Sequence, residues 1–244
     1  MSGSTCLWHC YNKKMNKRHD IRFPNESDDY RKQRNELLEE EIALRQKLES
    51  VAELRRKLPA GGELKENYIF DEISIDDEPM KTDFSSLFEP GKPSLLVYSF
   101  MFAPDAEAPC PACTSMIDGL NGSASHIRAK VNFVVVAKAP IDQFRSWADS
   151  RGWDKLRLLS SSENTYNRDY FGESADGQQQ MPSMNVFQKK GNAIIHTYGT
   201  ELLFTEPAED QHPRHADLFW PIWALFDLTP EGRGDNWFPR YHYD

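Results

Sequence analysis

The sequence predicts an α/β sandwich with a mixed central sheet and a long helix near the N-terminus. Short apolar runs that are typical of buried strands alternate along the chain with segments of helical character. A strand–turn–strand pair follows these units, which indicates that antiparallel strands complete a sheet that begins with parallel ones. About thirty residues of helical pattern precede the first strand, so we expect a long helix before the sandwich.

The long helix is expected over residues 25–60. Ser27 or Asp28 can cap its N-terminus, and Pro59 ends it. Leucine or valine recurs every seven residues and forms an apolar stripe along one face. The helix therefore packs against its own domain, or it reaches a second copy of the chain and forms a homodimer. The stripe consists of Leu37, Leu44, Val51 and Leu58.

The remaining elements follow in order from local patterns. Residues 94–102 form an almost unbroken apolar run, as expected of a strand that is covered on both faces. Further strands are expected at residues 68–75 with a turn near 76–77, and at 131–137, 156–159, 183–188 and 193–198. Helices are expected from the Cys110 region to residue 128, and over residues 141–150, 164–171 and 218–226.

These elements divide the chain into four parts. The first residues have almost no apolar periodicity, so we expect them to be disordered. The parts are a disordered segment over residues 1–24, the helix over 25–60, the α/β domain over 61–230 and a C-terminal tail over 231–244.

The composition excludes several functional classes. A net charge of −9 argues against a general nucleic-acid binder, which needs a basic face. The longest apolar runs have about nine residues, whereas a membrane span needs about twenty. Four cysteines in 244 residues are too few for a disulfide-framework miniprotein. Since no secretory signal pattern is visible, we expect a cytoplasmic location, where cysteines stay reduced unless they take part in redox or metal chemistry.

Cys110 and Cys113 form the strongest candidate site. They belong to a Cys-Pro-Ala-Cys motif that follows a buried strand and opens a helix. A thiolate at a helix N-terminus faces unsatisfied backbone N–H groups, which lower its pKa. Two intervening residues let the second thiol reach the first and resolve a mixed disulfide. We therefore expect Cys110 to be the exposed nucleophile and Cys113 the buried resolving thiol.

Met181 and Pro182 lie about seventy residues downstream, where a strand–turn–strand pair begins. With Cys110 and Cys113, this arrangement resembles a thioredoxin-fold protein. The resemblance implies that the residue before a strand-initiating cis-proline lies against the redox pair and offers its backbone to a bound chain. We therefore predict that the Met181–Pro182 bond is cis and that both residues contact substrate.

The resemblance extends over most of the chain. Residues 131–137, 158–160, 167–172 and 194–198 resemble the peroxiredoxin-like branch of the superfamily, the alkyl hydroperoxide reductase and thiol-specific antioxidant group. Residues 19–233 as a whole are similar to the thioredoxin-like family catalogued as domain of unknown function 899. The shared features are the long N-terminal helix, a Phe-Met-Phe strand, the Cys-Pro-x-Cys motif and a closing Asp-Leu-Thr-Pro-x-Gly-Arg sequence. That family is uncharacterised, so the resemblance implies the fold more strongly than the function.

Two departures from related proteins bear on the activity. Thioredoxins keep a buried carboxylate in the strand before the motif, whereas this strand holds Tyr98 and Ser99. Peroxiredoxins place a threonine three residues before the reactive cysteine, where this chain has Glu107, and Pro104 is six residues before Cys110 instead of the usual seven. We expect the negative charge of Glu107 to oppose ionisation of Cys110. These departures favour disulfide exchange over fast peroxide reduction.

The sequence therefore predicts a thiol–disulfide oxidoreductase that needs no bound cofactor. Its substrate would be a disulfide-bearing protein or a small thiol compound, and an external thiol would regenerate the dithiol. The alternatives are a non-catalytic thioredoxin-fold interaction protein and a weak thiol peroxidase. A metal site that includes Cys6, His9 and Cys10 is a further alternative. Three arginines that could stabilise a thiolate are expected instead in surface ion pairs: Arg145, Arg157 and Arg168.

Overall fold

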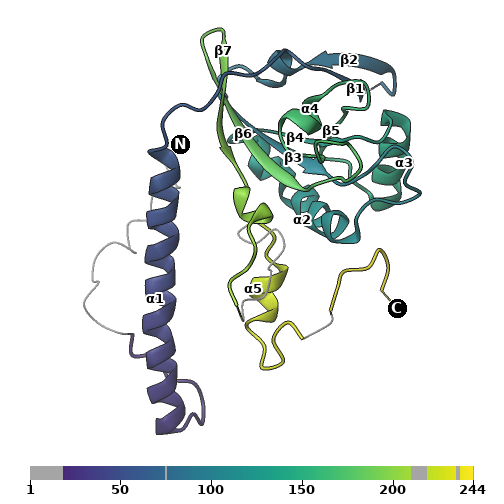
Figure 1. Ribbon diagram of the computed structural model, residues 1–244. Helices are drawn as coiled ribbons and strands as arrows, with labels where there is room; N and C mark the ends of the chain where they lie inside the picture. The colour runs from purple at the N-terminus through teal and green to yellow at the C-terminus, as the bar shows by residue number, and fades with distance from the viewer. Residues whose placement is uncertain (1–18, 75, 210–218, 235–236, 244) are drawn as a thin grey trace, which may run out of the picture. The chain divides into compact units, whose positions relative to one another are not determined.

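The computed structural model describes residues 19–74, 76–209, 219–234 and 237–243. The chain divides into two compact units, Met1–Lys57 and Leu58–Asp244 (Figure 1). The described part of the first unit is a turn followed by one long helix, and the second unit contains the sheet. No helix in the described ranges is long and apolar enough to cross a membrane.

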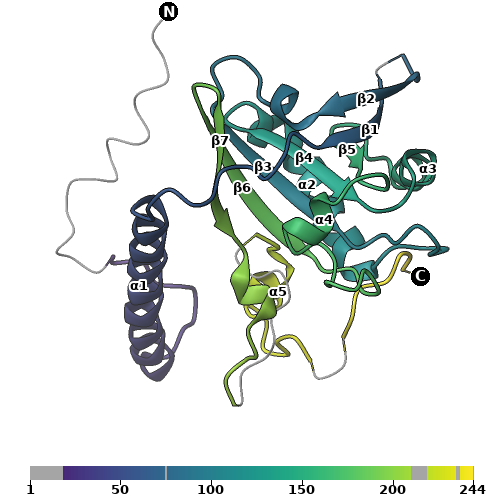
Figure 2. The same cartoon turned by 45° about the horizontal axis from the view of Figure 1, so that its top comes forward.

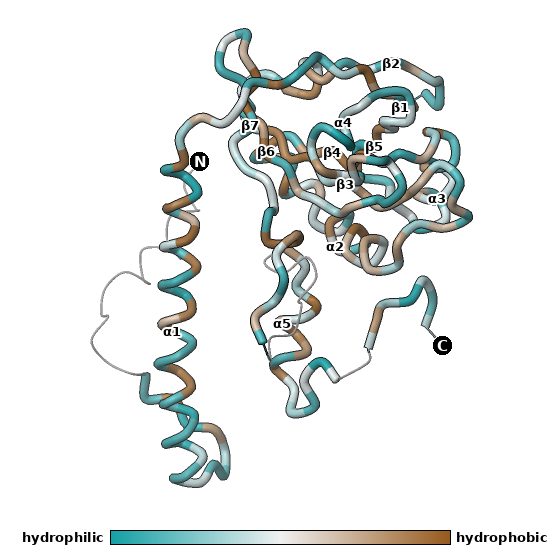
Figure 3. Tube along the Cα trace, in the orientation of Figure 1, coloured by the Kyte–Doolittle hydropathy of each residue, from teal (hydrophilic) through white to brown (hydrophobic). Residues whose placement is uncertain are grey.

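The long helix α1 spans Asp28–Arg56. Its N-cap is Ser27, whose hydroxyl accepts a hydrogen bond from the backbone N–H of Tyr30 at 3.1 Å. This capping satisfies one of the free N–H groups of the first turn, and it confirms the predicted start. Hydrophilic and apolar residues alternate along the helix (Figure 3). The three leucines of the predicted stripe are exposed, with exposed fractions of 51% for Leu37, 61% for Leu44 and 52% for Leu58, whereas Val51 is partly buried.

The second unit is built on a seven-stranded sheet in the order β2-β1-β5-β4-β3-β6-β7 (Figure 2). Strands β3, β4 and β5 run parallel, whereas the other neighbouring pairs are antiparallel. The predicted mixed sheet is therefore confirmed. The strands are β1 (Ile69–Ile73), β2 (Pro79–Asp83), β3 (Ser94–Phe100), β4 (Asn132–Ala137), β5 (Arg157–Ser160), β6 (Ser183–Lys190) and β7 (Ala193–Gly199).

The helices of this unit connect or flank the strands. Two of them are shorter than the sequence pattern predicts. The helix expected over 164–171 covers Tyr166–Asp169, because Tyr170 leaves helical conformation with a φ of −120° and Phe171 follows with a positive φ of 56°. The last helix begins only after Pro221. Residues 75 and 218, part of the predicted elements, lie outside the described ranges. The helices are α2 (Pro111–Arg128), α3 (Ile141–Arg151), α4 (Tyr166–Asp169) and α5 (Ile222–Phe226), with 3-10 turns η1 (Phe84–Leu87) and η2 (Glu201–Phe204).

Two hydrophobic cores lie on opposite faces of the sheet. Because side chains alternate along a strand, β3 contributes to both. Tyr98 and Phe100 enter the core that contains residues of α2, α3 and α5. Leu95 and Val97 enter the other core, which contains residues of η1 and α4. The strand is thus covered on both faces, as its unbroken apolar run predicts.

The second core is rich in aromatic rings, and Phe84 lies at its centre. The Phe84 side chain is fully buried, and its ring lies within 6.3 Å of the rings of Tyr68, Phe70, Phe88, Tyr166 and Phe187. The ring of Phe187 is the nearest, with the two centroids 4.8 Å apart. Such contacts add to the stabilisation from buried apolar area.

We predict that Phe84→Ala lowers the free energy of unfolding by about 3–5 kcal/mol, because the substitution leaves a cavity in a packed core. Urea denaturation followed by circular dichroism measures the change. Ile69→Ala is the control, since Ile69 is 48% exposed, and it should cost less than about 1 kcal/mol. Equal losses for the two variants would contradict this account of the core.

Candidate active site

Cys110 lies where the loop after β3 meets the first turn of α2. It occupies the N-cap position of α2, and Pro111 follows at the first helical position. The backbone N–H of Cys110 donates to the carbonyl of Met101 at 3.0 Å, and the N–H of Ala139 donates to the carbonyl of Phe102 at 2.8 Å. These bonds tie both ends of the loop to the carboxyl edge of the sheet, so the position of the thiol is set by the backbone.

The two cysteine side chains are brought together as free thiols with different exposure. Cys110 is half-buried, and Cys113 is 1% exposed. The Cys113 thiol donates a hydrogen bond to the Cys110 sulfur. The predicted nucleophile is thus the more accessible sulfur, and the predicted resolving thiol lies directly behind it in the core.

The surroundings shift the pKa values of the two thiols in opposite directions. The pKa of Cys110 is lowered to about 6, chiefly by the hydrogen bond from the Cys113 thiol and also by the backbone N–H groups of Cys113 and Ala112, which outweigh the effect of burial. The pKa of Cys113 is raised, because its proton is held in that bond and the side chain is buried. At neutral pH the negative charge of the pair therefore resides on Cys110.

Glu107 does not have the effect that its position in the sequence predicts. Its side chain is exposed in the loop, and it is not among the groups that shift the pKa of Cys110. The expectation that Glu107 opposes ionisation is not supported, because solvent screens an exposed charge. The three candidate arginines are in ion pairs: Arg145 with Asp149 at 3.0 Å, Arg157 with Glu72 at 2.7 Å and Arg168 with Glu173 at 3.5 Å. The Arg145 pair lies at the surface, as predicted, whereas the other two arginines pair with buried carboxylates.

The C-terminal tail lies against the loop beside Cys110. The Tyr241 hydroxyl donates to the carbonyl of Pro109, and its ring meets the Trp147 ring edge-on with centroids 5.1 Å apart. Arg151 donates to the Tyr241 carbonyl at 2.6 Å. Burial, and the negative charge of Cys110, raise the pKa of the Tyr241 hydroxyl. Tyr241 of the predicted tail thus contacts the loop that leads to Cys110, and no local sequence signal revealed this because the contacts span some ninety to 130 residues.

The predicted cis bond between Met181 and Pro182 is wrong. No peptide bond of the described residues is cis. The chain approaches β6 through a turn in which Glu173 pairs with Gln180 and the N–H of Met181 donates to the carbonyl of Gly172 at 2.9 Å. The trans form is the one generally favoured for a bond before proline.

The register of the sheet nevertheless brings Met181 and Pro182 to the same edge as the cysteine loop. Ser183 at the start of β6 lies opposite Ser99 near the end of β3. Since the two strands are antiparallel, the residues before Ser183 continue towards the loop that follows β3. Contact of Met181 and Pro182 with substrate stays a prediction.

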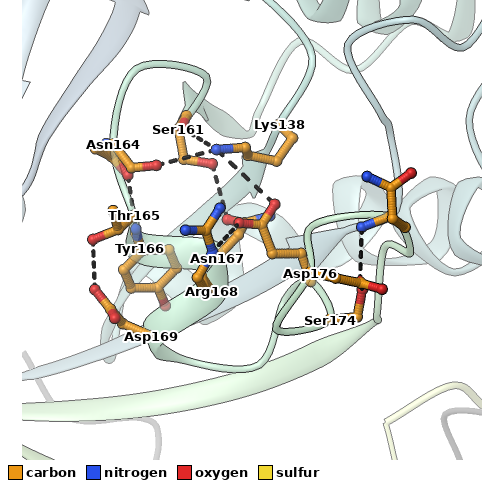
Figure 4. A network of polar contacts seen from close by, with 12 residues as sticks. Lys138, Ser161, Asn164, Thr165, Tyr166, Asn167, Arg168, Asp169, Ser174 and Asp176 are labelled. Atoms are coloured by element: carbon orange, nitrogen blue, oxygen red, sulfur yellow. Dashed lines mark hydrogen bonds and ion pairs between the residues drawn. The ribbon is translucent and has the colours of Figure 1, made fainter.

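A network of polar side chains lies beside the turn in which Glu173 pairs with Gln180 (Figure 4). Lys138 donates to the carbonyls of Ser161 at 3.2 Å and Asn164 at 3.1 Å. The Ser161 hydroxyl donates to the Asn167 side chain at 2.9 Å. Gly172 is required beside this network, because a Cβ there would lie 2.9 Å from the Ser99 hydroxyl. The sequence analysis missed the network, since its members come from separate loops.

No group of three or more metal-ligating side chains occurs within the described ranges. Cys6, His9 and Cys10, the residues proposed as further metal ligands, lie outside those ranges. The metal alternative for these residues therefore stays a prediction.

Residues 20–243 match the family described as "Bacterial protein of unknown function (DUF899)". This chain belongs to that family. The match confirms the resemblance to this family that the sequence motifs indicate. No curated protein matches the sequence of this DUF899 protein.

Several solved peroxiredoxin structures resemble this DUF899 protein at low sequence identity. AhpC of Enterococcus faecalis is 14% identical, with 57% of this chain and 78% of that chain covered and a TM-score of 0.44. Reduced Prx3 of Vibrio vulnificus in complex with hydrogen peroxide is 11% identical, with coverages of 68% and 99% and a TM-score of 0.45. The reduced 2-Cys peroxiredoxin of Plasmodium vivax is 16% identical, with coverages of 57% and 81% and a TM-score of 0.42. Identities of this size say nothing about activity.

We predict that alkylation of Cys110 by iodoacetamide reaches half its maximal rate near pH 6 in this DUF899 protein, since the pKa of that thiol is about 6. Cys113→Ala should move the midpoint to higher pH, because the thiolate loses its strongest hydrogen-bond donor. Both proteins carry Cys6→Ser and Cys10→Ser, so that only the pair reacts. An unchanged midpoint in Cys113→Ala would contradict the described origin of the pKa shift.

Proposed function

We propose that this protein is a thiol–disulfide oxidoreductase that uses Cys110 and Cys113 as its redox pair. The observation that supports this function is the asymmetry of the two thiols. Cys110 is half-buried with a pKa near 6, whereas Cys113 is buried and keeps its proton. An accessible thiolate backed by a protonated thiol within hydrogen-bond distance is what the two steps of disulfide exchange require.

The reaction begins when the Cys110 thiolate attacks one sulfur of a substrate disulfide. A bond forms between the Cys110 sulfur and that atom, the substrate S–S bond breaks, and the first substrate thiolate leaves. Cys113 then loses its proton and attacks the Cys110 sulfur. The second substrate thiolate leaves, and the protein holds a Cys110–Cys113 disulfide. The proton from Cys113 goes to one of the two released thiolates, and the other thiolate takes its proton from solvent water. Two electrons have passed from the protein to the substrate.

The other parts of the cycle follow from the same chemistry. An external thiol compound reduces the Cys110–Cys113 disulfide, so no bound cofactor is needed. The substrate is a disulfide-bearing protein or a small molecule that approaches along Met181 and Pro182. Because the N–H of Met181 already donates to Gly172, a bound chain would use the Met181 carbonyl. A cytoplasmic location fits a protein that reduces disulfides, since thiols are kept reduced there.

Reduction of insulin by dithiothreitol, followed by turbidity, tests this function. The wild-type protein should accelerate the reaction, and Cys110→Ser should abolish the acceleration. Cys113→Ser should accumulate a mixed disulfide on Cys110, which mass spectrometry detects, because the resolving thiol is absent. The double variant Cys6→Ser, Cys10→Ser is the control and should keep the wild-type rate.

Other outcomes of the same assay favour the alternatives. If Cys110→Ser reduces insulin as fast as the wild type, the pair is incidental and the protein is a non-catalytic thioredoxin-fold interaction protein. If Cys110 consumes hydrogen peroxide faster than it reduces disulfides, the protein is a thiol peroxidase.

We also propose that α1 joins two copies of the chain in a homodimer. Its apolar stripe repeats every seven residues, which is the spacing of a coiled-coil seam. The leucines of the stripe are about half exposed or more. Pairing of two helices would remove these side chains from water, so a second copy of α1 is the partner of matching chemistry.

Analytical ultracentrifugation tests the dimer. The full chain should sediment with twice the monomer mass, and deletion of residues 25–60 or Leu44→Glu should give the monomer, because a charge in an apolar seam is costly. Gln46→Glu is the control, since residue 46 lies on the opposite side of the helix from residue 44, and it should leave the dimer intact. A mass that the deletion does not change would exclude α1 as the interface.

A further inference from the structure

Tyr98 is a buried residue that neither the motif nor the reaction described above uses. It lies in β3, two residues before the end of the strand, and its side chain enters the same core as Cys113. Both side chains are 1% exposed or less. The Tyr98 hydroxyl is buried and makes no hydrogen bond of regular geometry in the reduced protein. A buried hydroxyl without a partner is unfavourable, so it calls for an explanation.

The Cys113 sulfur is the group next to this hydroxyl. The Tyr98 hydroxyl lies close enough to lower the pKa of Cys113 as a hydrogen-bond donor. In the reduced protein, however, Cys113 donates its proton to Cys110 and carries no charge that would draw the tyrosine into a well-formed bond. The hydroxyl thus lies beside a sulfur that becomes charged only later in the reaction.

We propose that the Tyr98 hydroxyl donates the hydrogen bond that stabilises the Cys113 thiolate while Cys113 resolves the mixed disulfide. This inference rests on the proposed function and names a further residue for it. Once Cys110 is bonded to substrate, it no longer carries the charge that held the Cys113 proton. Cys113 must then form a thiolate within an apolar core, which is costly unless a donor is at hand.

The proton balance of this step leaves Tyr98 unchanged. The Cys113 proton passes to the substrate thiolate that was released first, and the Cys113 sulfur attacks the Cys110 sulfur. The bond between Cys110 and substrate breaks, and the second substrate thiolate leaves. Tyr98 keeps its own proton throughout, because burial and the neighbouring charge of Cys113 raise the pKa of its hydroxyl. It therefore acts as a donor and not as an acid.

Few other titratable groups act on the Cys113 sulfur. The contributing groups are Cys110 from α2, Tyr98 from β3 and the backbone of Met101. Asp118, further along α2, is not among these groups, and its carboxylate pairs with Arg151 at 2.5 Å and accepts from the Trp153 ring N–H at 2.8 Å. Tyr98 is therefore the side chain that lies ready to stabilise the thiolate.

Tyr166 provides a matched control. It is also fully buried, and its hydroxyl also has no hydrogen-bond partner. It lies in the other core, among aromatic rings and away from the cysteines. Tyr98→Phe and Tyr166→Phe thus make the same chemical change in equivalent burial, and only the first removes a hydroxyl beside Cys113.

The test is a stopped-flow reaction of the full-length protein with a limiting amount of the aromatic disulfide DTNB. Each step releases one coloured thiolate, so the first phase reports attack by Cys110 and the second reports resolution by Cys113. All proteins carry Cys6→Ser and Cys10→Ser. Tyr98→Phe should leave the first phase within about twofold, slow the second about tenfold at pH 7 and raise its pH midpoint by about one unit. Tyr166→Phe should change neither phase.

The outcomes separate this inference from the proposed function. A second phase that Tyr98→Phe leaves unchanged, or that Tyr166→Phe slows equally, would overturn the inference alone. A wild-type first phase no faster than that of a free thiol would instead overturn the proposed function. Thermal denaturation of reduced Tyr98→Phe should show no loss of stability, since the hydroxyl has no partner to lose. If that variant does not fold, a ring-fluorinated tyrosine at position 98, which is a stronger donor, should lower the midpoint of the second phase.

Discussion

The hydrogen bond from the Cys113 thiol to the Cys110 sulfur is the interaction on which the site depends. It places the negative charge of the pair on the half-buried sulfur and the proton on the buried one, so that the pKa of Cys110 falls to about 6. The backbone N–H groups at the start of α2 act in the same direction, but their contribution is smaller. Without this bond the pKa of Cys110 would lose the largest contribution that lowers it, and the pKa of Cys113 would lose the largest contribution that raises it.

The geometry of this bond is held by the sheet. The loop after β3 returns so that the Cys110 N–H reaches the Met101 carbonyl, and α2 then packs on the core of Tyr98 and Phe100. Tyr241 closes the same loop from the C-terminal tail through its bond to the Pro109 carbonyl. Backbone contacts from distant segments therefore fix a pair whose chemistry is local.

Tyr98 bears on the absence of an acidic side chain from the strand before the motif. The strand before the motif carries no acid, which suggests weak support for the resolving thiol. In the fold, the tyrosine hydroxyl lies beside that thiol in an apolar core. A neutral donor avoids the cost of a buried charge in the resting state and becomes favourable only when Cys113 ionises. In the proposed reaction this hydroxyl stabilises the Cys113 thiolate, and the spacing of the motif alone does not reveal it.

The sequence by itself determined the features that depend on local chemistry. Apolar runs located the strands, Ser27 set the start of α1, and the Cys110–Cys113 spacing at a helix opening predicted which thiol is the more exposed. Tertiary structure alone decided the trans bond before Pro182, the place of Tyr241 and the neighbour of the Tyr98 hydroxyl. The physical reason is the sequence separation over which each kind of interaction acts. Capping, periodicity and helix-end electrostatics act within a few residues, whereas the conformation of a loop and the partner of a buried group are set by segments that meet only after the sheet has formed.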